Sequence, residues 1–154
     1  PSGKSSPLTR AAATRFESIY LLAPQQRIQV IKRGIPADHI GSLSARMDIP
    51  QETLIVALGL SRATINRKVR EQRPLSPDES ERVLGVELLI GQVEQMVKES
   101  GNPTGFDAAR WVSNWLNSSV PALGGETPAS YMDTFEGQKL VSNLLALSQS
   151  GAYA

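Results

Sequence analysis

The stretch that decides the fold is PQETLIVALGLSRATINRKVREQR, residues 50–73. Apolar residues at helical spacing run into Gly59, which can take the positive φ that a tight turn between helices needs. Ser61 follows as the expected N-cap of a second helix and accepts a hydrogen bond from the backbone near Thr64. The pattern predicts two helices joined by a short turn, with Ile65 facing inward from the second helix.

The second helix of this pair carries side chains of the kind that bind DNA. Arginine pairs bidentately with guanine, and asparagine pairs with adenine, when a short helix lies in the major groove. Other basic and amide side chains bind phosphates. The pattern therefore predicts a helix-turn-helix. Its expected DNA-binding residues are Gln51, Ser61, Arg62, Thr64, Asn66, Arg67, Lys68 and Arg70. The alternative is an ordinary helical hairpin with a solvated basic face. Lys68 departs from the motif, because many such motifs have an apolar residue at that position.

Charge is divided unevenly along the chain. The 154 residues include 16 Lys and Arg and 15 Asp and Glu, for a net charge of +1. Residues 1–76 hold 12 basic and 5 acidic residues, a net +7, whereas residues 77–154 hold 4 basic and 10 acidic residues, a net −6. The basic half favours a polyanionic partner, and the acidic half indicates that this partner does not cover the whole surface.

Composition excludes several kinds of site. The chain has no Cys and a single His, so a disulfide framework, a thiolate metal site and a multi-histidine metal site are excluded. That residue, His39, has no nucleophile in a recognisable motif, so we interpret it as structural and expect no catalytic residues and no cofactor. No apolar run reaches about 18 residues, and residues 1–10 lack the apolar core of a signal peptide. We expect a cytoplasmic protein with no membrane contact.

Helical spacing dominates the chain, so the predicted fold class is all-α, with a helix-turn-helix module followed by a second helical module. We expect residues 1–9 to be disordered. Residues 10–76 are predicted to form an N-terminal helical domain, with a first helix over residues 10–22, and residues 77–154 a second domain.

Polar residues mark the expected helix starts. Asp48 is placed to cap the helix over residues 50–58, and Ser76 with Glu79 forms a capping box. A long helix to about Lys98 should follow. Its apolar residues recur every three or four positions and cover a wide face. Because helix-turn-helix operators usually have two half-sites, we expect a homodimer that uses this face, over residues 78–98.

Breaks divide the last third of the chain into further helices. Phe106 is expected on the buried face of a helix that Thr104 or Asp107 begins. Gly137 is expected to interrupt the chain before the last helix and to let two helices pass closely. The paired Gly124 and Gly125 form no phosphate-binding loop, because the segment is short and no Lys-Ser/Thr follows it.

One constellation in this region is distinctive. Trp115-Leu116 is followed by PALGGETP at residues 121–128, then by Thr134, Gly137, Val141 and a closing Gly151. This pattern resembles the toxin-binding domain of the Xre/MbcA/ParS antitoxin family, and the upstream helix-turn-helix is similar to the Xre type. The resemblance covers roughly residues 50–154.

The resemblance implies an antitoxin paired with a RES-domain toxin, a class similar to ADP-ribosyltransferases that acts on NAD. Such an antitoxin covers the NAD pocket of the toxin and represses their shared promoter through the helix-turn-helix. The implied toxin-binding residues are Trp115, Leu123, Gly124, Gly125, Gly151, Ala152, Tyr153 and Ala154. The acidic half would then face a toxin whose substrate site needs cationic groups. Residues 151–154 could reach into the toxin pocket, or they could be a frayed terminus.

Two alternatives stay open. A helix-turn-helix transcription regulator whose C-terminal domain senses a small ligand predicts ligand-dependent operator affinity and no toxic partner. An enzyme would need a reactive constellation, and without Cys and with one His the chain offers few options.

Overall fold

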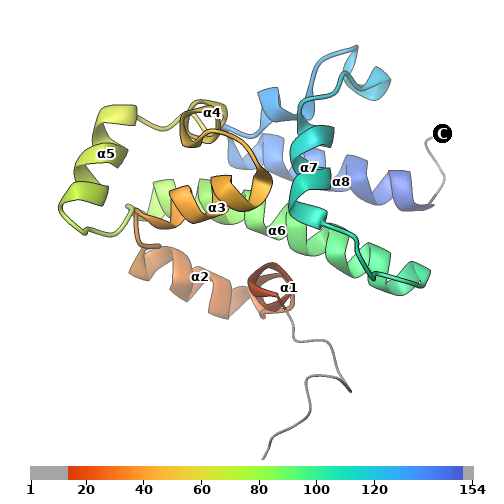
Figure 1. The fold of residues 1–154 in the computed structure, drawn as a ribbon, viewed down its shortest axis with the longest axis horizontal. Coiled ribbons are helices and arrows are strands. Elements are labelled where there is room, and N and C mark those ends of the chain that lie inside the picture. Colours follow the sequence, from red (N-terminus) through yellow and green to blue (C-terminus); the bar gives the residue numbers. More distant parts are fainter. Residues whose placement is uncertain (1–13, 151–154) are drawn as a thin grey trace, which may run out of the picture.

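A computed structural model of the chain describes residues 14–150 (Figure 1). Within that range the regular elements are all helical, so the predicted all-α fold class is confirmed. The α-helices are α1 (Arg15–Tyr20), α2 (Pro24–Arg33), α3 (His39–Met47), α4 (Gln51–Ala57), α5 (Arg62–Arg70), α6 (Pro77–Ser100), α7 (Ala108–Leu116) and α8 (Phe135–Ser150). Two short 3-10 helices, η1 (Pro121–Leu123) and η2 (Pro128–Tyr131), lie between α7 and α8. Over the described range, no helix combines the length and the hydropathy that crossing a membrane would require.

Helix α6 runs through the middle of the molecule, and α1, α2, α7 and α8 pack against it (Figure 1). Ser76 and Glu79 form the predicted capping box at its start. Its fully buried apolar residues are Val83, Leu84, Val86, Leu89, Ile90 and Val93. Most of the wide face that we expected to be a dimer surface is therefore covered by helices of the same chain, and that expectation is wrong for most of the face. The predicted domain boundary coincides with the start of α6, whereas α6 itself packs against helices from both sides of that boundary.

Helix α1 lies directly on α6. A Cβ atom added at Gly91 would come within 2.3 Å of the Phe16 carbonyl oxygen, so only glycine permits this approach. The side chains of Phe16 and Ile19 are buried. The helix begins later than predicted, because Thr14 acts as its N-cap, and residues 10–13 lie outside the described range.

The connector before α6 is held by the connector before α3. Pro36 and Pro74 form an isolated antiparallel bridge, and the Leu75 N–H donates to the Ile35 carbonyl at 2.8 Å. The buried Ser80 hydroxyl of α6 accepts from the Ile35 N–H at 2.9 Å. These bonds fix where the chain leaves α5 and enters α6.

Three expectations about the helix ends and faces are wrong. Asp48 does not cap α4; it ends α3 in the left-handed conformation, with φ 60°, and Pro50 occupies the N-cap of α4. Gly137 does not interrupt the chain but lies inside α8, where a Cβ would come within 1.9 Å of the Tyr131 carbonyl oxygen. The glycine is thus needed for close approach and not for a break. Phe106 precedes α7, which Asp107 caps, and is 39% exposed.

A buried carboxylate joins three helices. Glu87 of α6 is fully buried. Its carboxylate accepts from Arg15 Nε of α1 at 2.8 Å and lies 2.5 Å from His39 Nε2 of α3. Burial alone would raise the pKa of Glu87, but the hydrogen bonds from His39 and Arg15 hold that pKa below its ordinary value. His39 therefore has a structural role.

We predict that Glu87→Gln lowers the free energy of unfolding at pH 7 by about 2 kcal/mol, because hydrogen bonds to a charged group are lost. The folded-state pKa of Glu87 lies below its unfolded value of 4.5, so its contribution is complete above that pH and disappears as pH falls through the lowered pKa. Denaturant titrations between pH 7 and pH 3 should show the two proteins converging in acid. A difference that does not depend on pH would contradict this assignment.

Candidate DNA-binding and toxin-binding surfaces

The turn between α4 and α5 has the geometry expected of a helix-turn-helix. Gly59 takes φ +67°. Its N–H donates to the Val56 carbonyl at 3.0 Å, and the Leu60 N–H donates to the Ile55 carbonyl at 3.0 Å. This pair of bonds closes the C-terminus of α4 and turns the chain sharply. The predicted role of Gly59 is confirmed.

Helix α5 starts as the sequence predicts. The Ser61 hydroxyl accepts from the Thr64 N–H at 3.2 Å, which satisfies a backbone donor in the first turn. Ile65 is fully buried, and Val69 packs against the core one turn later. The opposite face is thereby turned to solvent.

The predicted DNA-binding residues fall into two sets. Those exposed along one face of α5 are Arg62, Asn66, Arg67 and Arg70, with Ala63 between them, and Ser61 is exposed at its start. Spacings of four residues place these side chains one above another on the helix. Thr64 and Lys68 are partly buried, as is Gln51 at the start of α4. The structure thus brings the arginines and Asn66 together and sets Lys68 apart.

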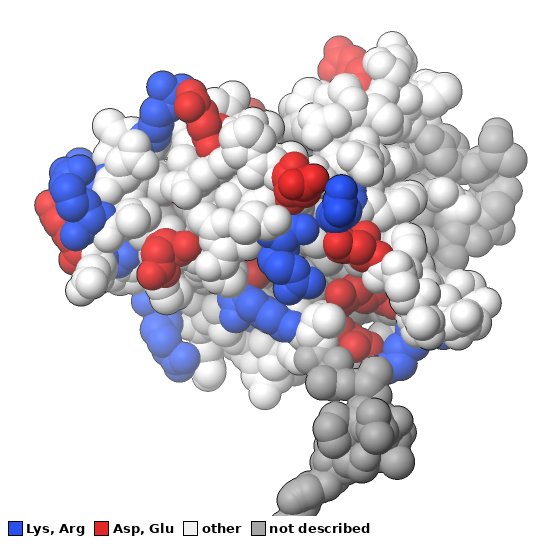
Figure 2. All heavy atoms as spheres, viewed as in Figure 1, with Lys and Arg blue, Asp and Glu red and all other residues white. Residues whose placement is uncertain are grey.

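Ion pairs divide the basic residues of α5 further. Arg62 pairs with Glu52 of α4, and both side chains stay about 60% exposed. Figure 2 shows basic side chains at the α5 end of the molecule with acidic side chains beside them. Among the residues that the structure describes, Arg67 and Arg70 take part in no ion pair. These two cations are therefore available to phosphates.

Lys68 forms a largely buried ion pair that joins α5 to α6. Its Nζ lies 2.6 Å from Glu79 Oε1 of α6, and the two side chains are only 12% and 15% exposed. Glu79 also accepts from the Ser76 N–H at 2.8 Å. Burial would raise the pKa of Glu79, but the bonds from Lys68 and Ser76 hold it below its ordinary value. Many such motifs have an apolar residue at the position of Lys68, and here the carboxylate of Glu79 neutralises the lysine instead.

Sequence reasoning missed the residue that holds the turn. Arg82 of α6 donates from Nη1 to the carbonyls of Leu58 at 3.0 Å and Gly59 at 3.1 Å. Its own carbonyl accepts from Gln138 Nε2 of α8 at 3.1 Å. The sequence holds only one weak signal for Arg82, its spacing of four residues from Asp78, with which it also pairs.

The paired glycines form a closed, projecting loop. Gly124 and Gly125 follow η1 with φ +68° and +88°, so both take conformations that other residues rarely adopt. The Gly125 N–H donates to the Val120 carbonyl at 3.1 Å, and the Val120 N–H donates to the Glu126 carbonyl at 3.1 Å. Figure 1 shows this loop standing away from the helix bundle, beyond α7. Both glycines are exposed and Leu123 is half-buried.

A stacked pair of tryptophans lies on α7. The ring centroids of Trp111 and Trp115 are 6.0 Å apart, and the angle between the two ring planes is 12°. Trp115 packs against the core, whereas Trp111 is 39% exposed. Sequence reasoning chose Trp115 and missed Trp111, although their spacing of four residues places both on one helix face. The predicted tail, Gly151 to Ala154, lies outside the described residues.

Together, the turn, the cap, the inward Ile65 and the exposed polar face define a helix-turn-helix protein with an appended helical module. The family described as "Antitoxin Xre-like helix-turn-helix domain" matches residues 26–86, and the "Antitoxin Xre/MbcA/ParS C-terminal toxin-binding domain" matches residues 105–151.

Two curated relatives agree with these matches. The "Prs ADP-ribosylating antitoxin" of Sphingobium sp. (strain YBL2) is 46% identical over 139 residues, which cover 90% of this chain and 87% of the relative. The "Antitoxin Xre" of Yersinia enterocolitica serotype O:8 / biotype 1B (strain NCTC 13174 / 8081) is 23% identical over 127 residues, which cover 82% of this chain and 80% of the relative.

The chain belongs to the Xre/MbcA/ParS antitoxin family. It is an antitoxin of a toxin-antitoxin system. Its C-terminal module implies a toxin partner, and its helix-turn-helix implies DNA binding. The resemblance that the sequence carries is confirmed at the level of the family.

We predict that Arg67→Gln and Lys68→Gln affect different properties of the protein. Loss of a phosphate contact at Arg67 should make the slope of log K against log salt shallower by about 0.9. Lys68→Gln should leave that slope unchanged and lower the free energy of unfolding by about 1 kcal/mol, because Glu79 loses its partner. Fluorescence anisotropy with operator DNA at several salt concentrations, together with denaturant titrations, measures both. An equal change of slope in the two variants would show that Lys68 also binds phosphate.

Proposed function

We propose that this antitoxin represses its own operon through α5 and neutralises a RES-type toxin by covering the NAD site of the toxin with its C-terminal module. The observation that carries the proposal is the separation of the two surfaces. The exposed face of α5 contains arginines and an asparagine, and the Trp111 stack and the Gly124–Gly125 loop lie in the region that matches the toxin-binding domain.

On DNA, Asn66 and Arg62 are the proposed base-reading residues, and Arg67 and Arg70 bind phosphates. The ion pair with Glu52 orients the Arg62 guanidinium at the start of α5. Two copies bind the two half-sites of an operator, so the protein acts as a homodimer. This assignment is supported by the free polar face of α5 and by the match to the Xre-like domain.

Toward the toxin, the proposed mechanism is occlusion of the substrate site and not catalysis by the antitoxin. The name of the Sphingobium relative supports a toxin that transfers ADP-ribose, and NAD is the donor in such a transfer. An exposed tryptophan on the helix that precedes the projecting loop offers a large, rigid contact of the kind that dominates protein interfaces. Residues 151–154 are proposed to extend this contact.

We predict that Trp111→Ser and Asn66→Ala separate the two activities. Trp111→Ser should weaken toxin binding about 30-fold, as expected for an interface tryptophan, and should fail to protect cells that express the toxin from the neighbouring gene, while it still represses a reporter under the operon promoter. Asn66→Ala should protect the cells but lose about 1–3 kcal/mol of discrimination between operator and random DNA.

Leu21→Ser is the matched control, because Leu21 is 62% exposed and lies far along the chain from both surfaces. It should behave like the natural protein in both assays. If Trp111→Ser protects the cells fully, the α7 surface does not contribute to toxin binding. If the natural protein does not protect cells that express the toxin, the proposed RES class of the toxin is wrong.

A further inference from the structure

The C-terminal end of α2 lies beside the segment that leaves α5. Helix α5 is followed by Gln72 in the left-handed conformation, with φ 55°, which ends the helix and turns the chain. The Ala37 N–H then donates to the Arg73 carbonyl at 3.2 Å. Gly34 follows α2 directly, and a Cβ added there would come within 3.1 Å of the Pro74 Cβ. The last turn of α2 and the end of α5 are therefore neighbours, although they are far apart in the sequence.

Basic side chains gather at this junction. Lys32 and Arg33 end α2 and are exposed, as are Arg70, the last residue of α5, and Arg73. Within residues 14–150, Lys32, Arg33 and Arg70 take part in no ion pair, whereas Arg73 pairs with Glu71 at 3.5 Å. Figure 2 shows basic side chains along this end of the molecule, over α5 and at the outer end of α2. Three cations at the junction are therefore available to a partner.

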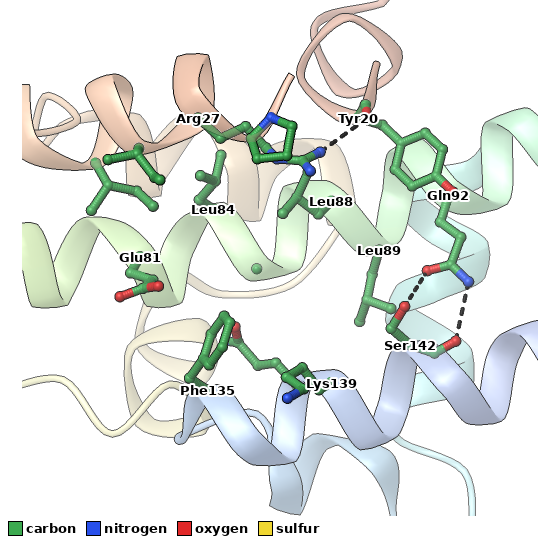
Figure 3. A pocket seen from close by; sticks show the side chains of 15 residues that line it. Tyr20, Arg27, Glu81, Leu84, Leu88, Leu89, Gln92, Phe135, Lys139 and Ser142 are labelled. Carbon is green, nitrogen blue, oxygen red and sulfur yellow. Dashed lines mark hydrogen bonds between the residues drawn. The ribbon is translucent and has the colours of Figure 1, made fainter. Parts of the chain in front are cut away.

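The third cation of α2 is used within the fold. Arg27 Nη1 donates to the Tyr20 carbonyl at 3.1 Å, and its side chain lines the apolar groove between α2, α6 and α8 (Figure 3). Arg27 is partly buried there. Lys32 and Arg33 instead keep their charged groups in solvent, where they can offset the C-terminal dipole of α2. Any further role of these two residues requires a partner outside the chain.

The length of α5 decides where the junction would lie on DNA. From Arg62 to Arg70 the helix rises about 12 Å, at about 1.5 Å per residue, and the major groove is about 12 Å wide. With Arg62 and Asn66 at the base edges, Arg70 reaches the phosphate strand that borders the groove. Figure 1 shows the end of α2 beyond the C-terminal end of α5. The end of α2 would therefore lie outside the groove, over neighbouring phosphates.

We propose that Lys32 and Arg33 bind phosphates of the DNA that flanks each half-site, and so extend the DNA-binding surface from α5 onto α2. The inference rests on the proposed function, because it needs α5 to lie in the major groove. The junction holds four basic residues against two exposed carboxylates, Asp38 and Glu71, so its field attracts a polyanion. An acidic protein would also be attracted, but the continuity of these cations with α5 favours the polyanion that α5 binds.

Two duplexes from the promoter of the chain's own operon test this proposal. The long duplex extends about ten base pairs, one helical turn, beyond each half-site. The short duplex ends at the outermost base pair whose exchange changes the affinity. Fluorescence anisotropy gives the slope of log K against log salt on both duplexes for the natural protein and for each variant.

On the long duplex, Lys32→Gln and Arg33→Gln should each make the slope shallower by about 0.9 for each bound copy, and the double variant by about 1.8. On the short duplex, all of these proteins should have the same slope, because the flanking phosphates are missing. Exchange of the flanking sequence should change none of these results, since phosphate contacts carry no sequence information.

Arg27→Gln is the matched control, because it removes one charge from the same helix at the groove of Figure 3. Its slope should equal that of the natural protein on both duplexes. A double variant that keeps the natural slope on the long duplex would overturn the proposal and leave Lys32 and Arg33 only their role at the end of α2. Slopes that fall equally on both duplexes would also overturn it, because they would place the contact within the half-site.

The failures of the two proposals can be told apart. If the natural protein binds neither duplex, the DNA-binding part of the proposed function is wrong, and this inference is wrong with it. If the natural protein binds both duplexes and every variant has its slope, the proposed function stands and only the contact from α2 is wrong.

Discussion

Helix α6 must bury apolar side chains on most of its circumference, and it carries three buried polar side chains among them, Ser80, Glu87 and Gln92. A buried polar group destabilises the fold unless it finds a hydrogen-bond partner. Each of the three finds it on a different part of the chain. Ser80 binds the connector before α3, Glu87 binds α1 and α3, and Gln92 binds α8. Apolar packing alone would tolerate shifts of these elements along α6, whereas these bonds specify one arrangement.

The same helix positions both proposed functional surfaces. Glu79 and Arg82, in its first two turns, hold Lys68 of the recognition helix and the carbonyls of the turn before it. Through its carbonyl, Arg82 also contacts Gln138 of α8. The surface that we assign to DNA is thus held by α6, and the C-terminal module packs on the same helix through α7 and α8. The two modules share one hydrophobic core.

Features with a local cause could be predicted from the sequence. Gly59, Ser61 and Ile65 act within a few residues of their own positions, and the structure has them as predicted. Features whose cause lies elsewhere in the chain could not. Asp48 can either cap the next helix or end the previous one, and only the packing of α3 against α4 decides between them.

Gly137 and Arg82 are of the second kind. In the sequence Gly137 suggests a helix break, because the sequence does not show that the Tyr131 carbonyl lies against this glycine. In the sequence Arg82 suggests a surface cation, because the sequence does not show that its guanidinium reaches the turn of the helix-turn-helix. For the C-terminal surface, which stays a prediction, the resemblance pointed to the Gly124–Gly125 loop and to Trp115 but not to the exposed Trp111, because exposure depends on the neighbouring elements.

We infer that the two modules form a single folding unit around α6. Both tryptophans lie on α7, so tryptophan fluorescence follows the C-terminal module, whereas hydrogen exchange of the α5 amides follows the helix-turn-helix. In one urea titration followed by both probes, we predict a single midpoint and a single slope. Two separated transitions, with α5 losing protection while the tryptophan signal stays native, would contradict the account.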